Sequence, residues 1–288
     1  MATIDLSQLP RPAIIEALDF EVILAEIKQF MISRFPEELR PAVAAALELE
    51  SEPLNIIAQA FAWRELLLRQ RINDGAAACM LSHSVSTDLD NIASNMGTRR
   101  LVITPATDTT DAVMESDTAL RMRAQAAFDG LSVAGPTGAY EYFAKSASGN
   151  VADAKAVSPS PAVVVISVLS TEGDGTATPE LLATVKDALS AEDRRPVGDR
   201  LTVQSAEIVN YNINARLFFY PGPESEPIQN AAHDALQAWI TLQGKIGRDV
   251  ARSAIMAALH VQGIQRVELT EPATDIVISD TQAARCVS

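Results

Sequence analysis

Cysteine and histidine, the residues that most often form disulfides and zinc sites, are scarce in this chain of 288 residues. It has two cysteines, Cys79 and Cys286, and three histidines without HxxxH spacing, so a disulfide framework is excluded and a zinc site is not expected. No segment reaches the roughly 18 uninterrupted apolar residues that a membrane span needs. The start, MATIDLSQLP, lacks the basic and apolar regions of a signal peptide. We therefore expect a soluble protein of a reducing compartment.

Positive charge is also in short supply. The chain has 23 Lys and Arg residues against 37 Asp and Glu residues, which gives a net charge of -14. Phosphate backbones and anionic membrane surfaces repel such a chain, so we predict no nucleic-acid partner and no membrane partner. Hydrophobic residues make up 48% and charged residues 21%, a globular composition. The length suffices for about two domains.

The first hundred residues have the periodicity of helices. Ile14, Leu18 and Val22 share one helical stripe. Further on, apolar residues recur every seven positions, and two isoleucines accompany them. The recurring residues are Leu47, Leu54, Phe61 and Leu68, and the isoleucines are Ile57 and Ile72. This heptad-like spacing fits either a core stripe inside the domain or a seam against a helix of another subunit. Pro53 interrupts it, so we expect two helices rather than one rod.

The middle of the chain has weaker patterns. A helix is predicted over Ser116–Phe128, with Ser116 as its N-cap and Asp117 in its first turn. The segment Ser146–Pro161 is rich in small and polar residues, and we interpret it as a domain boundary that contains a short strand.

The last part of the chain has clear strand and helix patterns. Ala162–Leu169 is a β-branched run typical of a strand covered on both faces. Thr178 and Pro179 then open a helix as N-cap and first helical residue. Strict alternation over Val209–Phe219 predicts one long, half-buried strand. The elements expected after it are a helix with Ile228, Ala232, Ala235, Trp239 and Leu242 on one stripe, a helix over Asp249–His260 and a strand over Ile264–Thr270.

These patterns predict a multidomain α+β fold. We expect a helical N-terminal region over residues 1–96, a small mixed middle domain and linker over 97–160, and a C-terminal α/β sandwich over 161–288. In the sandwich, helices pack on a mixed sheet.

One turn has the composition of a ligand loop. Glu172, Gly173, Asp174 and Gly175 precede a helix N-terminus, where phosphates often bind. However, neither GxxxxGK[ST] nor GxGxxG is present, and the two carboxylates repel an anion. We interpret the segment as a tight turn that uses glycine for positive φ. No catalytic residue, cofactor site or metal site is predicted.

Several segments, in order along nearly the whole chain, resemble the baseplate assembly protein J family of temperate contractile-tailed phages. They are LESEPL, WRELLLRQRIND, TDLDNIASNMGTRRL, ESDTALRMRAQAAFDGLSVAGPTGAYEYFAKSAS, VVVISVLSTEGDGTATPELLATVKDAL and EDRRPVGDRLTVQSAEIV. The block ESD-x-x-LR-x-R followed by AGP-x-x-AY is the most specific of them.

The resemblance implies a structural protein of the baseplate wedge, in a phage or tailocin, and no enzyme. Family members assemble around the hub and spike in sixfold arrays, commonly as two copies with one copy of another wedge protein. The implied partners are tail protein I-like and sheath-initiator-like subunits, hub and spike proteins, and further copies of the chain as dimers and a ring. The implied location is the tail baseplate of the virion, after assembly in the host bacterial cytoplasm.

The resemblance also assigns roles to the predicted regions. The N-terminal helices would enter a bundle with a partner, and the C-terminal domain would contact neighbouring copies in a ring that rearranges when the sheath contracts. Our interface hypothesis for the bundle is Leu47, Leu54, Ile57, Phe61 and Leu68. Two alternatives stay open: an α/β enzyme that uses the Glu172–Gly175 loop for a small molecule, and a transient cytoplasmic assembly scaffold.

Overall fold

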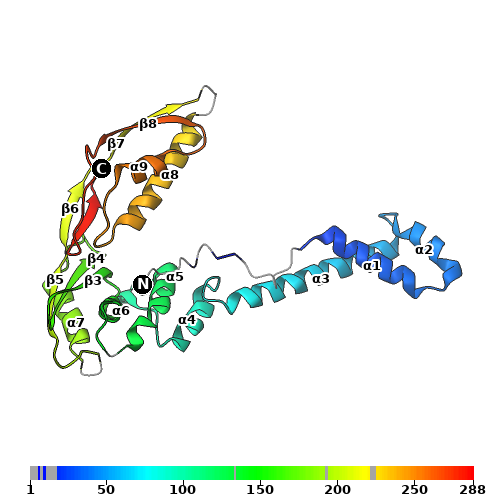
Figure 1. The fold of residues 1–288 in the computed structure, drawn as a ribbon. Coiled ribbons are helices and arrows are strands. Elements are labelled where there is room, and N and C mark those ends of the chain that lie inside the picture. Colours follow the sequence, from blue (N-terminus) through cyan, green and yellow to red (C-terminus); the bar gives the residue numbers. More distant parts are fainter. Residues whose placement is uncertain (1–5, 7–8, 11–17, 133, 192–193, 221–224) are drawn as a thin grey trace. The chain divides into compact units, whose positions relative to one another are not determined.

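The computed structural model describes residues 6, 9–10, 18–132, 134–191, 194–220 and 225–288. The chain divides into two compact units, Met1–Asn95 and Met96–Ser288 (Figure 1).

The first unit is helical in its described part. Its elements are α1 (Phe20–Arg34), the 3₁₀ helix η2 (Glu37–Leu39), α2 (Arg40–Leu47), α3 (Pro53–Ala78) and α4 (Ser86–Asn95). Helix α1 begins after Asp19, whose carboxylate accepts hydrogen bonds from the backbone N–H groups of Glu21 and Val22 at 2.9 and 3.2 Å. The predicted stripe over Ile14, Leu18 and Val22 is therefore wrong at Leu18, which precedes the helix, and Ile14 lies outside the described residues.

Helices α1 and α3 pack side by side, and α3 returns along α1 after the short helix α2 (Figure 1). Ile23 and Leu24 of α1 are buried against Ala58 and Ala62 of α3. Alanines at these positions let the two backbones approach closely, so the larger α1 side chains fill the space between them. Helix α2 ends at Leu47 and α3 starts at Pro53, which confirms that the heptad-like segment forms two helices.

The second unit combines helices and strands. Its elements are β1 (Val102–Thr104), β2 (Val113–Met114), α5 (Asp117–Ala126), η3 (Asp129–Leu131), α6 (Thr137–Ala147), β3 (Val151–Ser160), β4 (Val163–Ser170), α7 (Pro179–Leu189), β5 (Arg200–Ser205), β6 (Glu207–Tyr211), β7 (Asn214–Phe219), α8 (Ser225–Gln243), α9 (Arg252–Leu259), β8 (Ile264–Glu271) and β9 (Gln282–Cys286).

A three-stranded mixed sheet, in the order β3-β4-β5, forms the first layer of this unit. Strands β3 and β4 are antiparallel, whereas β5 returns parallel to β4 after the crossover helix α7. Helices α6 and α7 cover the sheet, and their buried residues, such as Tyr140 and Val185, share a core with Ile166 and Val168 of β4. The multidomain α+β fold class is confirmed. The mixed sheet differs from the expected one, because its strand β3 and its helix α6 precede residue 161, where the C-terminal sandwich was expected to begin.

The segment Ser146–Pro161, which we interpreted as a domain boundary with a short strand, does contain a strand, and that strand has ten residues. It contains the end of α6 and strand β3, whose Ala154 and Ala156 pair with Val168 and Ile166 of β4. Small side chains are needed there because the helices lie directly on this strand, so composition reflected close packing rather than a free connection.

The long strand predicted over Val209–Phe219 is two strands in two different sheets. Strand β6 pairs in parallel with β9, and β7 pairs in antiparallel with β8. The alternation still describes the inward side correctly, because Val209, Tyr211, Ile213, Ala215 and Leu217 all contribute to one core with α8 and α9.

Candidate functional site

Helix α3 exposes an apolar stripe along much of its length. At 3.6 residues per turn, Ile57, Phe61, Leu68 and Ile72 lie within about 60° of one another around the helix axis. Their exposed fractions are 47, 62, 59 and 60%, respectively. Ala58 and Ala62, which pack on α1, face a different direction. This outward face, defined by Leu54, Ile57, Phe61, Leu68 and Ile72, is named the α3 stripe below.

The structure brings four of the five sequence-predicted interface residues together. Leu54, Ile57, Phe61 and Leu68 follow one another along α3, with Leu54 half-buried in its first turn. Leu47 is placed elsewhere: it is the last residue of α2, and only 1% of it is exposed. The chain turns between α2 and α3, so the seven-residue count from Leu47 to Leu54 crosses a break and does not describe a shared face.

A second apolar set on α3 was missed by the sequence reasoning. This set consists of Ile56, Trp63 and Leu67, which are all exposed. Around the helix axis, the α3 stripe lies between this set and Ala58. Trp63 contacts Phe20 of α1 edge-on, with 6.4 Å between the ring centroids. Trp63 follows Ile56 by seven residues and precedes Leu67 by four, and both spacings are typical of one helical face. The sequence therefore contained this signal, but the heptad pattern selected only the other face.

Charged side chains border the α3 stripe. Arg64 and Arg71 lie about 20° and 40° from Ile57 around the helix, and both are exposed. Arg69 points to the α1 side, where it contacts Glu65 at 2.5 Å and Glu26 at 3.7 Å. The face thus combines large apolar side chains with cations, a composition typical of protein interfaces.

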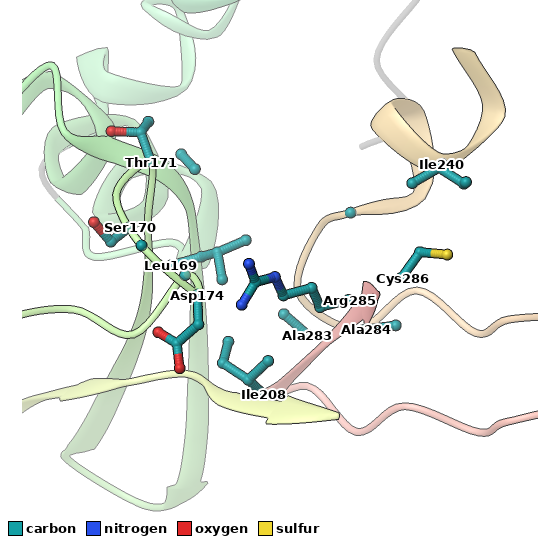
Figure 2. Close-up of a pocket in the computed structure, with 14 residues that line it drawn as sticks. Leu169, Ser170, Thr171, Asp174, Ile208, Ile240, Ala283, Ala284, Arg285 and Cys286 are labelled. Carbon is teal, nitrogen blue, oxygen red and sulfur yellow. The ribbon is translucent and has the colours of Figure 1, made fainter. Parts of the chain in front are cut away.

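The second unit contains an open cavity of about 410 Å³ beside the Glu172–Gly175 turn. Leu169 and Asp174 lie on one wall, and Ile208, Ile240 and Arg285 lie on the other side (Figure 2). The Arg285 side chain extends toward the turn that carries Asp174. These walls come from β4 and its turn on one side, and from β6, α8 and β9 on the other.

The chemistry of this cavity does not favour catalysis. Burial raises the pKa of the Cys286 thiol, which disfavours the nucleophilic thiolate. The backbone N–H of Thr176 donates to the Asp174 carboxylate and lowers its pKa, so this group is a weak general base. None of the histidines lines the cavity.

The Glu172–Gly175 turn itself has a structural explanation. Gly173 and Gly175 have φ values of 61° and 96°, which favour glycine. The Gly175 carbonyl accepts the Ser170 N–H at 2.8 Å and closes the turn. A Cβ on Gly175 would lie 2.9 Å from Leu169 Cδ1, so close packing also requires glycine.

Across the described part of the chain, no three His, Cys, Asp or Glu side chains gather in a group able to hold a metal ion. Among the helices that the structure describes, none combines the length and apolarity of a membrane span.

Comparisons with known proteins agree along the chain. Residues 50–107 match the baseplate J-like N-terminal domain, 132–205 the baseplate J-like central domain and 211–288 the baseplate J-like protein C-terminal domain. Baseplate protein J of Escherichia phage P2 is 57% identical over 290 residues, which cover 99% of this chain and 96% of that protein. The chain belongs to the baseplate J-like family.

Membership of the baseplate J-like family makes the chain a structural component of the baseplate of a contractile phage tail. One solved structure with a similar chain is the cryo-EM structure of the anti-feeding prophage (AFP) baseplate, 6-fold symmetrised. The likeness covers 62% of this chain and 43% of that chain, at 14% identity and a TM-score of 0.43, which is too low to establish a shared fold.

The baseplate J-like N-terminal domain match includes all of α3 and therefore the whole α3 stripe. The central match covers α6, the β3-β4-β5 sheet and α7, and the C-terminal match starts at the end of β6.

Proposed function

We propose that this chain is a wedge subunit of the baseplate and that the α3 stripe joins a helical bundle with other baseplate polypeptides. The observation that carries this proposal is the exposure of Ile57, Phe61, Leu68 and Ile72 on one face of a 26-residue helix. Burial of such side chains contributes about 1.5–3 kcal/mol each, so a bundle along this face would hold a wedge together.

Leu47 takes no part in this proposal. Its side chain is buried inside the first unit, and its carbonyl oxygen accepts a hydrogen bond from Lys28 Nζ at 2.8 Å. Leu47 therefore stabilises the return from α1 to α3, while Ile72 extends the docking face in its place.

The test is a double variant, Leu54→Asp with Phe61→Asp, introduced into the full chain during tail production. Two buried carboxylates in an apolar seam are strongly unfavourable, so we expect wedges and complete tails to be lost. The β3-β4-β5 sheet and its helices should stay folded, as measured by circular dichroism and protease resistance of the second unit. Val197→Asp is the control, because it adds a charge at a fully exposed residue outside α3. Normal tail assembly by the double variant would show that the bundle assignment is wrong.

The proposal extends to the rest of the wedge. In it, residues 1–96 form the bundle region, 97–160 a middle domain and 161–288 a domain that contacts neighbouring copies in a sixfold ring around the hub and spike. The partners are tail protein I-like and sheath-initiator-like subunits, with two copies of this chain in each wedge. Assembly occurs in the host bacterial cytoplasm, and rearrangement of the ring accompanies sheath contraction.

Crosslinking within assembled tails tests the ring. Contacts that rearrange are expected to be moderate in area and partly polar. Links between C-terminal parts of adjacent copies, from about Ala162 onward, are expected, and their absence would exclude the ring arrangement.

The proposed subunit stays in the particle and performs no catalysis. Mass spectrometry of purified tails should therefore detect the chain, whereas a transient scaffold would be missing. A thermal-shift panel of nucleotides and metal ions should leave the melting temperature unchanged, and a strong shift would favour an enzyme.

A further inference from the structure

Three arginines lie on α3, and their surroundings differ. Arg69 donates from Nε and Nη2 to Glu65 Oε1 at 3.0 and 2.5 Å and also approaches Glu26. Arg64 and Arg71 are exposed, and within the ranges that the structure describes neither forms a hydrogen bond or an ion pair. The arginine on the α1 side is thus paired inside the chain, whereas the two beside the α3 stripe have no such pair among the described residues.

Arg64 and Arg71 continue the seven-residue spacing of the α3 stripe. Leu54, Phe61 and Leu68 are spaced by seven, and so are Ile57, Arg64 and Arg71. In heptad notation the first series takes position a and the second takes position d, so both arginines point into any helix that docks on the α3 stripe. A guanidinium removed from water in such a seam is costly unless a carboxylate pairs with it.

A second copy of α3 does not supply these carboxylates. The acidic residues of this helix are Glu65 and Asp74. Glu65 is bound to Arg69, and Asp74 Oδ1 accepts from Gln70 Nε2 at 2.6 Å. A parallel pair of α3 helices in register would also place each arginine against its own counterpart, because equivalent seam positions face each other. Two guanidinium groups that face each other in this way repel, which destabilises the pair of helices.

We infer that the helix docking on the α3 stripe belongs to a different baseplate polypeptide and carries two carboxylates, about seven residues apart, that pair with Arg64 and Arg71. This inference rests on the proposed function and deepens it by stating the chemistry of the partner. The apolar residues supply affinity without fixing the register, whereas the paired charges select an acidic helix and fix its position along α3.

Zero-length crosslinking tests the pairing directly. The variant Arg64→Lys with Arg71→Lys keeps both charges and introduces amines that a carbodiimide couples to adjacent carboxylates. Tails assembled from this variant are treated with carbodiimide, digested and analysed by mass spectrometry. We expect amide links from positions 64 and 71 to Asp or Glu residues of another polypeptide, spaced by about seven. Arg69→Lys is the matched control and should link to Glu65 or Glu26 of its own chain. Links only to a second copy of this chain, or no links at either position, would overturn the inference.

Charge reversal provides the second test. Arg64→Glu with Arg71→Glu should lower the yield of assembled tails at least tenfold, while the lysine variant assembles at the normal yield. Both positions are exposed, so circular dichroism of the chain should be the same for all variants. Normal assembly of the glutamate variant would overturn the inference even if Leu54→Asp with Phe61→Asp blocks assembly, in which case the bundle stands without the charge pairing. Normal assembly of the aspartate variant would remove the bundle itself.

Discussion

Arg123 and Glu115 form a two-pronged ion pair inside the second unit. Arg123 Nε lies 2.8 Å from Glu115 Oε1 and Nη2 lies 2.7 Å from Oε2, while the two side chains are 8% and 7% exposed. Arg123 also donates to the Arg99 carbonyl and to Ser146 Oγ, and Glu115 accepts from the Leu101 N–H. The pair thereby fastens helix α5 to the segment that enters β1 and to the end of α6.

Loss of one partner of this pair should destabilise the second unit strongly. Arg123→Ala leaves the Glu115 carboxylate buried without its cation, for which a loss of about 3–5 kcal/mol in the free energy of unfolding is expected. Chemical denaturation measures it. Arg266→Ala is the control, because its pair with Glu268 is about half exposed and is worth at most about 1 kcal/mol. Equal effects of the two substitutions would contradict the assigned burial.

Substitutions at the neighbouring positions Phe61 and Ala62 of α3 should differ in their effect on stability. Phe61→Ala removes an exposed ring and should leave the free energy of unfolding of the isolated chain within about 0.5 kcal/mol of its original value. Ala62→Leu inserts a larger side chain where α1 packs and should cost about 1–3 kcal/mol. Thermal melting of the helical signal compares them. A larger loss for Phe61→Ala would mean that the outer face stabilises the chain on its own.

Asp153 joins the three-stranded sheet to the segment after α8. Its carboxylate pairs with Lys145 Nζ at 2.7 Å and accepts the Ile246 N–H at 3.1 Å. Asp153→Ala should lower the free energy of unfolding by about 1.5–3 kcal/mol, the range for hydrogen bonds to charged groups, and accelerate hydrogen exchange at Ile246. Asp153→Asn retains an acceptor, so it should affect Ile246 exchange less. Unchanged exchange in the alanine variant would argue against this contact.

Alkaline pH should destabilise the C-terminal core through Tyr211. Burial raises the pKa of Tyr211 from 10.0 to about 12, because the charged phenolate is disfavoured inside the core. The folded state therefore holds this proton more tightly than the unfolded state, and the resulting stabilisation is complete below pH 10.0 and is lost as the pH rises to about 12. Denaturation curves over this interval should show the loss, and Tyr211→Phe should lack that part of it. The same slope in the variant would contradict burial of the hydroxyl group.

Local signals at helix starts were predictable from sequence because they depend on adjacent residues. Ser116 and Thr178 were expected as N-caps, and their hydroxyl groups accept from the N–H groups of Ala119 and Leu181, both at 3.3 Å. Pro179 also occupies the first helical position, as predicted. Such contacts are complete within one helical turn, so no knowledge of the tertiary fold is needed.

Strand partners were not predictable in the same way. The alternation over Val209–Phe219 indicates which side chains face the core. It continues through both β6 and β7, so it does not indicate that these are two strands with different partners. Ile213 N–H donates to the carbonyl of Ser288, so the chain changes sheets at a point fixed by its distant C-terminus. Sequence periodicity has no information on that contact.

The candidate interface was partly predictable. Helical spacing identified Ile57, Phe61 and Leu68, because a shared face within one helix follows from the sequence alone. The seven-residue spacing also included Leu47, because spacing along the sequence does not show that the chain changes direction between α2 and α3. Arg64 and Arg71 were present in the same spacing, but only the structure shows that neither has a hydrogen-bond or ion-pair partner among the described residues.

The exposed apolar side chains of α3 also affect how the protein behaves before it is incorporated. A contiguous apolar face on a free subunit promotes self-association, and this self-association increases with protein concentration. Overproduction of this chain alone should therefore yield aggregates, and balanced synthesis with the proposed partner of α3 should suppress them. Without that partner, we expect this exposed face, rather than the stability of the fold, to limit the yield of non-aggregated chain.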